Sequence, residues 1–490
     1  MLLNNFISKI PTKILLFSIL SLFCYLFFGY DLIRTNFTKL LLLYFALFCF
    51  FYKIIQISKD NILLLTFLSI LFRFVFLFSI PNLSQDFYRF IWDGRMLFEG
   101  LNPYLYLPEN FINQQKFPVH QAVELYTGMG EFNGSHYTNY PPLNQLSFFI
   151  TALFAGKSIL GSVIVLRVQL ILADIGIIYF GKKILEKLHL PIHYIFLYAL
   201  NPFIIIELTG NLHFEPVMLF FLIWSMSALL NDTFVLAGIL LACSISIKLI
   251  PLLFLPLFYQ WFMKRSVFAS KTEHVNNDNM SFLQRQKSKQ RLLWIHVSAG
   301  MTRLFRFYAI VITTILLFFL PFYSSELIDN YFNSVGLWFL NFEFNASFYY
   351  IFKKIGSLFR GYNEIAIIGK IIPVLTIVFL GWITFFRKNS SPKELITGLL
   401  FGLSFYYFTT TTMHPWYLAT LILLSVFTKY RFPIVWSLVI ILSYSAYSND
   451  VYKENLLLIN IEYIVVYGFL IWELLFKPKI NLKIKTINTI

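Results

Sequence analysis

The sequence has little charge and few cysteines, and both shortages limit the kind of protein it encodes. Only 13% of the 490 residues are charged, whereas 58% are hydrophobic. A soluble domain carries about 25% charged residues, and no polar region here is long enough to form one. The three cysteines, Cys24, Cys49 and Cys243, lie inside apolar runs, so no disulfide framework or cysteine metal site is visible.

Apolar runs recur from one end of the chain to the other, and about 20 such residues cross a bilayer. A longer run at 233–262 is broken by Lys248 and Pro251, which suits two short helices in a hairpin. The basic, apolar N-terminus is expected to be a retained first helix. The sequence predicts an all-α, polytopic transmembrane protein of about 12–14 helices forming a single domain, 1–490. The other runs are 13–30, 38–56, 62–80, 160–180, 193–210, 214–230, 306–322, 365–386, 395–411, 415–429, 432–447 and 457–476.

The net charge of +15 predicts an orientation in the membrane rather than nucleic-acid binding, because excess Lys and Arg collect in cytoplasmic loops. The largest basic segment is a predicted cytoplasmic loop, 263–305. If that loop is cytoplasmic, both termini and the remaining basic clusters are cytoplasmic as well, and the segment 81–159 is non-cytoplasmic. We therefore expect an integral protein of a bacterial inner membrane. The other basic clusters are Lys53 and Lys59, Lys182 and Lys183, Arg387 and Lys388, Lys429 and Arg431, and Lys477–Lys485.

The predicted non-cytoplasmic loop 81–159 has an acidic bias and holds the strongest candidate for chemistry. On a helix, Asp86, Arg89 and Asp93 share one face at i, i+3 and i+7. One interpretation is a carboxylate general base at the membrane surface, with Arg89 holding a neighbouring carboxylate or a phosphate. The alternative is an Asp–Arg–Asp surface network of purely structural value.

Four further polar residues are candidates for binding substrate. His213 and Glu215 lie where one apolar run meets the next, and they suit either ligand binding or a helix-capping turn. His414 precedes a Pro-Trp-Tyr sequence and suits either a phosphate donor or an aromatic belt. Lys248 inside an apolar stretch is costly and indicates a functional site, although it can also extend to the membrane interface.

The motifs of the acidic loop resemble a known enzyme superfamily. They are Asp86-Phe-Tyr-Arg89-Phe-Ile-Trp-Asp93-Gly-Arg95, Gly100-Leu-Asn-Pro-Tyr104 and Tyr140-Pro-Pro-Leu143. This set is similar to the first outer loop of the GT-C glycosyltransferases, especially the mannosyltransferases that use polyprenol-phosphate-mannose. The resemblance implies that Asp86 is the catalytic base or acceptor-binding carboxylate and that Asp93 is the second acidic position. Arg89, Arg95 and Tyr140 are then expected substrate-binding residues.

The resemblance implies inverting transfer of a sugar, mannose first, from a polyprenyl-phosphate donor to an acceptor hydroxyl on the non-cytoplasmic face. The acceptor is expected to be a glycan, a glycolipid or a protein, and the other partners are membrane lipids. The compact Asp-x-Asp pair of several GT-C families is absent, so we expect no metal and no cofactor beyond the donor. A polysaccharide polymerase or ligase, or a lipid-linked sugar flippase, is the alternative function.

Overall fold

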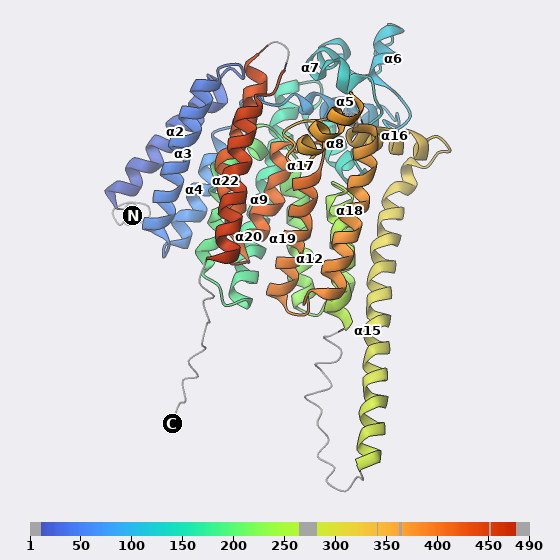
Figure 1. Cartoon of the computed structure of the whole chain (residues 1–490). Coiled ribbons are helices and arrows are strands. Elements are labelled where there is room, and N and C mark those ends of the chain that lie inside the picture. The colour runs from blue at the N-terminus through green and yellow to red at the C-terminus, as the bar shows by residue number, and fades with distance from the viewer. Residues whose placement is uncertain (1–10, 264–281, 341, 362–364, 450–451, 477–490) are drawn as a thin grey trace.

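The computed structural model describes residues 11–263, 282–340, 342–361, 365–449 and 452–476, and they form a helical bundle (Figure 1). None of these residues belongs to a strand, although Phe344 and Thr412 form an isolated parallel bridge. The elements are α2 (Thr12–Tyr30), α3 (Phe37–Ser58), α4 (Ile62–Phe74), α5 (Asp86–Phe98), α6 (Pro108–Asn113), α7 (Ala122–Gly134), α8 (Pro142–Ala155), α9 (Ile159–Lys187), η1 (Ile192–Ile195), α10 (Phe196–Ala199), α11 (Pro202–Ile204), η2 (Ile205–Gly210), α12 (Glu215–Leu230), α13 (Phe234–Ile245), η3 (Ile250–Leu257), α15 (Phe282–Phe319), η4 (Leu320–Phe322), α16 (Leu327–Leu340), α17 (Phe348–Arg360), α18 (Ile365–Phe386), α19 (Pro392–Thr409), η5 (Pro415–Tyr417), α20 (Leu418–Val426), α21 (Phe432–Val439), η6 (Ile440–Ser448) and α22 (Leu456–Leu475).

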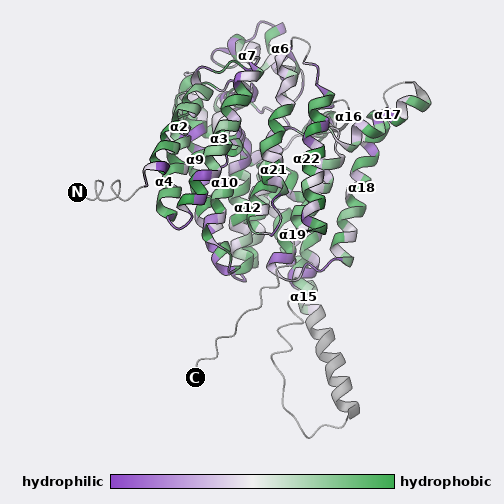
Figure 2. Ribbon diagram, turned by 60° about the vertical axis from the view of Figure 1, so that its left-hand side comes forward, coloured by the Kyte–Doolittle hydropathy of each residue, from purple (hydrophilic) through white to green (hydrophobic). Residues whose placement is uncertain are grey.

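The predicted all-α polytopic membrane fold is confirmed. Within the described part of the chain, six helical segments are long and apolar enough to cross a membrane, and a pair bent by 48° adds a seventh if it is one span. Shorter apolar helices pack between them, so apolar residues cover most of the bundle (Figure 2). The long segments are Thr12–Tyr30, Phe37–Ser58, Ile159–Lys187, Ser298–Phe322, Ile365–Phe386 and Leu456–Leu475, and the bent pair is Ile192–Ala199 with Pro202–Gly210.

The predicted loop 81–159 is folded into four helices, α5 to α8, which lie at one end of the bundle together with α16 and α17 (Figure 1). We call this end the site face. Helix α5 packs on α8 so closely that a Cβ at Gly94 would lie 2.2 Å from the carbonyl oxygen of Phe148. The rings of Phe90 and Phe148 stack with centroids 4.7 Å apart. A glycine at position 94 therefore permits α5 to lie flat against α8.

The long apolar run at 233–262 is broken where the sequence predicts. Helix α13 ends at Ile245, η3 begins at Ile250, and Lys248 lies in the turn between them. The backbone carbonyl of Ser246 accepts hydrogen bonds from the N–H groups of Leu143 and Asn144 at the start of α8. The turn is thereby attached to the folded loop at the site face.

Basic connections gather at the opposite end of the bundle. Arg431 lies over the ring of Tyr194 at 4.8 Å, and Lys187 donates to the side chain of Asn231 at 2.7 Å. Of the predicted basic loop 263–305, residues 264–281 lie outside the described residues, and 282–305 form the first part of α15. This grouping agrees with one common orientation for the basic clusters.

Candidate active site

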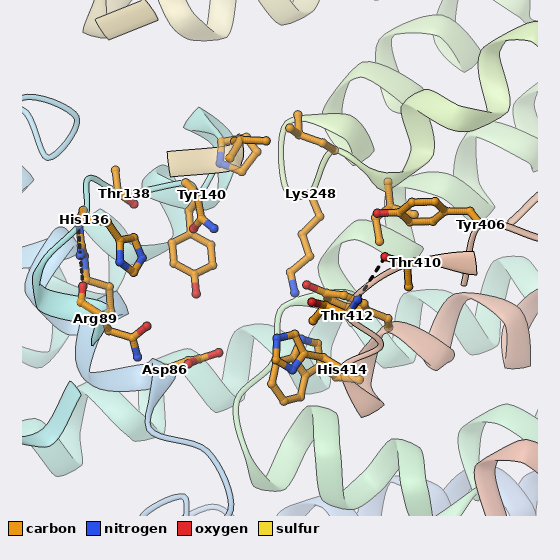
Figure 3. Close-up of a pocket in the computed structure, with 18 residues that line it drawn as sticks. Asp86, Arg89, His136, Thr138, Tyr140, Lys248, Tyr406, Thr410, Thr412 and His414 are labelled. Carbon is orange, nitrogen blue, oxygen red and sulfur yellow. Dashed lines mark hydrogen bonds between the residues drawn. The ribbon is translucent and has the colours of Figure 1, made fainter. Parts of the chain in front are cut away.

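A cavity of about 210 Å³ opens at the site face between two walls that come from distant parts of the chain (Figure 3). The loop wall consists of α5 and the segment 133–141, and the bundle wall consists of the 248–250 turn, one residue of α16, the end of α19 and the segment 410–417. Pockets for drug-sized ligands run to about 300–1,000 Å³, so this cavity suits one small group. Its lining is Asp86, Arg89, Asn133, His136, Thr138, Asn139, Tyr140 and Pro141 on the loop wall, and Lys248, Leu249, Ile250, Val335, Tyr406, Thr410, Thr412, His414, Trp416 and Tyr417 opposite.

Asp86 is the carboxylate that faces this cavity. It is the first residue of α5, and its side chain is 25% exposed. Partial burial raises the pKa of Asp86 to about 6; the positive charge of Lys248 opposes the shift, and Glu215 adds to it. A carboxyl group whose pKa lies near neutral pH, at the edge of a cavity, suits a general base.

Arg89 and Asp93 form a buried scaffold behind Asp86. Arg89 donates from Nε to Asp93 at 2.8 Å and from Nη1 to the carbonyls of Asn133 and His136 at 2.5 and 3.0 Å. The other oxygen of Asp93 accepts from Gln145 at 3.0 Å. Asp93 is fully buried and does not line the cavity. Arg89 does line it, and among the described residues its Nη2 has no hydrogen-bond partner. The ion pair therefore fixes the 133–141 segment on α5 and leaves the two N–H groups of the buried Nη2 without a partner among the described residues.

Arg95 and Tyr140 have different surroundings. Arg95 is buried away from the cavity, where it donates to the carbonyls of His120 and Lys157 at 2.5 and 3.0 Å and so holds the loop together. Tyr140 lines the cavity, and its ring meets that of Phe90 edge to face at 5.0 Å. Tyr140 therefore offers a ring surface to a ligand, whereas Arg95 stabilises the loop.

Lys248 reaches into the cavity from the bundle wall (Figure 3). Its Nζ lies 2.5 Å from Oε1 of Glu215, the first residue of α12, which is buried. The side chain of Lys248 retains 17% exposure. The ammonium group has two further N–H donors for a ligand, and Glu215 supports it without lining the cavity.

Hydroxyl groups and an imidazole surround the ammonium group. Thr410, Thr412 and His414 line the cavity beside Lys248. Thr412 is fixed by donating to the carbonyl of Phe342 at 2.8 Å. Burial and the positive charge of Lys248 together lower the pKa of His414 to about 3, so the imidazole is neutral at physiological pH. This wall combines one cation with neutral donors, a set that suits a phosphate group.

His213 does not line the cavity but lies directly behind Asp86. Its Nε2 is 3.9 Å from Oδ2 of Asp86, and its Nδ1 is 2.8 Å from the backbone carbonyl oxygen of Glu207. The side chain is 1% exposed. The residue therefore contacts the carboxylate and not the cavity.

The structure thus divides the residues that the sequence singled out into two groups. Asp86, Arg89, Tyr140, Lys248 and His414 meet at the cavity. Behind them lie Asp93, Arg95, His213 and Glu215. In the described part of the chain, no group of three His, Cys, Asp or Glu side chains is placed to hold a metal ion.

His136 and Tyr406 also line the cavity, and neither was predicted from the sequence. His136 lies in a polar run, Asn133-Gly-Ser-His136-Tyr-Thr-Asn139, directly before the Tyr-Pro-Pro motif. That position beside the motif was the available signal. Tyr406 lies within an apolar helical pattern and gave no signal.

A comparison with known proteins finds a family model that matches part of the chain. Residues 40–265 match the model of the MptA_B family, described as alpha-(1->6)-mannopyranosyltransferase, N-terminal domain. No curated protein matches the chain. The matched segment contains the whole loop wall and the Lys248 turn, whereas the 410–417 part of the bundle wall lies beyond it.

Proposed function

We propose that this membrane mannosyltransferase takes its mannose from a polyprenyl-phosphate donor and transfers it with inversion. The premise is the match of residues 40–265 to a family of GT-C-type mannosyltransferases. The observation that carries this proposal is the arrangement of Asp86 and Lys248 on opposite walls of one cavity of about 210 Å³ (Figure 3). A base and a phosphate-binding cation then face each other across a space that suits one sugar.

The reaction follows from those positions. The carboxylate of Asp86 takes the proton of the acceptor hydroxyl, and the acceptor oxygen forms a bond to the anomeric carbon. The bond between that carbon and the phosphate oxygen breaks on the opposite side, and its electron pair leaves with the lipid phosphate. One displacement of this kind inverts the anomeric configuration. A phosphate is a good leaving group, so the acid that a glycosidase supplies is not required.

The bundle wall would stabilise the departing phosphate. Lys248 supplies a positive charge, and Thr410 and His414 supply neutral hydrogen-bond donors beside it. The lipid chain of the donor would lie against the apolar helices, because the cavity is at the end of membrane-spanning segments. We place this end on the non-cytoplasmic side, opposite the basic connections, as the positive-inside rule predicts.

The acceptor proposed first is a mannoside with a free primary hydroxyl, since the family description names an alpha-(1->6) linkage. A primary hydroxyl extends beyond the sugar ring and can reach Asp86 while the rest of the acceptor remains outside the cavity. The small volume of the cavity, about 210 Å³, is consistent with entry of only the acceptor terminus.

The test uses the full-length protein in membranes with radiolabelled polyprenyl-phosphate mannose and a mannose-terminated acceptor. Wild-type protein should form a mannosylated acceptor, and Asp86→Asn should reduce its rate by about 10²–10⁴-fold, the usual value of a general base. Asp31→Asn is the matched control, because Asp31 is exposed and pairs with Lys39 outside the cavity.

Three results would contradict the proposal. One is transfer by Asp86→Asn at the wild-type rate, and another is use of a nucleotide-linked mannose in place of the lipid donor. The third is movement of the lipid-linked sugar across the membrane without cleavage, which would indicate a flippase.

A further inference from the structure

The position of His213 gives it a role that neither the cavity nor the family match assigns. Its ring is buried, and its Nε2 lies 3.9 Å from Oδ2 of Asp86. That nitrogen is buried and has no hydrogen-bond partner among the described residues. A buried nitrogen without a partner, directed at the proposed base, requires an explanation.

The other ring nitrogen fixes the tautomer. Nδ1 of His213 lies 2.8 Å from the backbone carbonyl oxygen of Glu207, which only accepts hydrogen bonds. Nδ1 therefore carries the hydrogen. In the neutral ring, Nε2 then presents its lone pair toward Asp86.

Two features keep the ring neutral and in place. The indole of Trp416 stacks on it with centroids 3.8 Å apart, so the ring cannot turn away. Burial holds the pKa of His213 well below its usual range, and the positive charge of Lys248 lowers it further. Nε2 is therefore available as an acceptor at neutral pH.

We propose that His213 is a positioning residue for Asp86, whose Nε2 lone pair accepts a hydrogen bond from the Asp86 carboxyl group once that group has taken the acceptor's proton. This step rests on the proposed function. The proton moves from the acceptor oxygen to Asp86 and stays bonded to it, shared with Nε2, until product leaves and water removes it. The present separation of 3.9 Å is longer than a hydrogen bond; catalytic contacts often shorten only when substrate is bound.

Other titratable groups, on the elements packed around Asp86 and His213, face these two residues. They influence whether Asp86 is ionised before substrate binds. Lys248 favours the ionised form of Asp86, whereas Glu215 disfavours it. The carboxylate of Glu207 lies 3.7 Å from Nδ1 of His213. The remaining groups are Arg89, Tyr140, His414, Tyr417 and Tyr447.

The distinguishing readout is the pH profile of transfer. A neutral acceptor at Nε2 stabilises the protonated form of Asp86 and so raises the pKa of its carboxyl group. Removing the acceptor should therefore move the acid limb of kcat to lower pH and weaken the base. A merely structural role for His213 would lower the amount of folded enzyme and leave the position of the limb unchanged.

The test compares His213→Asn and His213→Gln in the full-length protein in membranes, with polyprenyl-phosphate mannose as donor. An asparagine amide can still donate to the Glu207 carbonyl but has no acceptor at the place of Nε2. The Asn variant should lose roughly tenfold or more in kcat with little change in KM, and its acid limb should shift downward. The Gln variant carries its amide to the place of Nε2 and should keep the limb near its wild-type position.

His120→Asn is the matched control, because His120 is exposed in the segment 81–159, away from His213 in the chain, and its pH profile should match that of wild type. An acid limb that stays in place or moves upward in His213→Asn overturns the proposal. If His213→Asn does not fold, an acid limb of kcat that moves to lower pH in His213→Gln overturns the proposal instead. Absence of transfer by the wild-type protein contradicts the proposed function and not the role of His213.

Discussion

The indole ring of Trp416 lies flat against the imidazole ring of His213, with centroids 3.8 Å apart and planes inclined by 19°. The indole also stacks on His414, with centroids 4.5 Å apart and planes inclined by 6°. One aromatic side chain thus holds the imidazole behind the proposed base and the imidazole on the phosphate side of the cavity. Proton removal by Asp86 and departure of the phosphate, the two parts of the proposed reaction, therefore both depend on the position of Trp416.

This support predicts that the shape of residue 416 affects catalysis. Trp416→Leu removes both stacks, each worth about 0.5–1.5 kcal/mol, and kcat should fall at least tenfold, whereas Trp416→Phe should retain part of the activity. Trp382→Leu is the control, since Trp382 lies 53% exposed on α18. Equal activity of the Leu and Phe variants at residue 416 would mean that stacking has no role.

The pairing of Lys248 with Glu215 predicts two separable effects. Lys248→Met should raise the KM for the lipid donor by about 10–100-fold, because hydrogen bonds to charged groups contribute about 1.5–3 kcal/mol. It should also destabilise the protein, because Glu215 keeps a buried charge without a partner, at a cost of about 3–5 kcal/mol.

The double variant Lys248→Met with Glu215→Gln separates those effects. Thermal unfolding in detergent should return toward the wild-type temperature, because the unpaired charge is gone, while the KM for donor stays high. A double variant with wild-type KM would show that Lys248 acts on stability alone.

The raised pKa of Asp86 predicts the pH dependence of the wild-type enzyme. The base must be ionised to accept a proton, so kcat/KM, which reflects the free enzyme, should be constant above the pKa of about 6 and should fall about tenfold per pH unit below it. The pKa values of His136 and His414, about 4 and 3, lie below this range, so neither ring changes charge there. A rate that does not change between pH 5 and pH 8 would contradict the assignment of Asp86 as base.

Arg167 predicts a purely structural effect. Its guanidinium donates to the carbonyls of Thr209 and Gly210 at 2.8 and 2.9 Å and to those of Leu77 and Ser79 at 3.1 and 2.8 Å. It therefore ties the segment before α5 to the end of η2.

Arg167→Met leaves these carbonyls without a donor and should destabilise the protein by roughly 4–5 kcal/mol, which is exceptional for one substitution. The unfolding temperature in detergent should drop clearly, whereas Lys116→Met at an exposed loop position should not change it. An unchanged unfolding temperature in Arg167→Met would show that water replaces the guanidinium at no cost.

The proposed orientation predicts which residues can be labelled from outside the cell. Lys116→Cys lies on the site face and should react with a membrane-impermeant maleimide in intact cells. Lys388→Cys lies at the opposite end, and it should react only after the membrane is opened. Both positions are exposed, so access to reagent is the only difference, and the reverse pattern would invert the orientation.

Much of the fold could be predicted from the sequence, because spanning helices need only a long apolar run. The helical face of Asp86 and Arg89 was also predicted, and α5 does begin at Asp86. Spacing could not show that Asp93 turns inward, since that depends on Gln145, 52 residues away, which donates to it at 3.0 Å.

The support for the site was less predictable. Lys248 and Glu215 were both singled out, but their ion pair requires the turn after α13 to return to the start of α12. The contact between His213 and Glu207 needs the π-helical turn of η2, which leaves the Glu207 carbonyl for the imidazole. Local sequence patterns do not encode where such a turn places its carbonyl groups.

The division of the cavity between distant segments has a consequence for biogenesis. The loop wall and Lys248 are synthesised with the first half of the chain. Thr410, Thr412 and His414 follow only after α15, α18 and α19 have been made. A nascent chain that has passed Lys248 but not His414 therefore has a base and a cation with no enclosure around them. The proposed site therefore acquires its second wall only near the end of synthesis, and we expect a chain truncated before that point to be inactive.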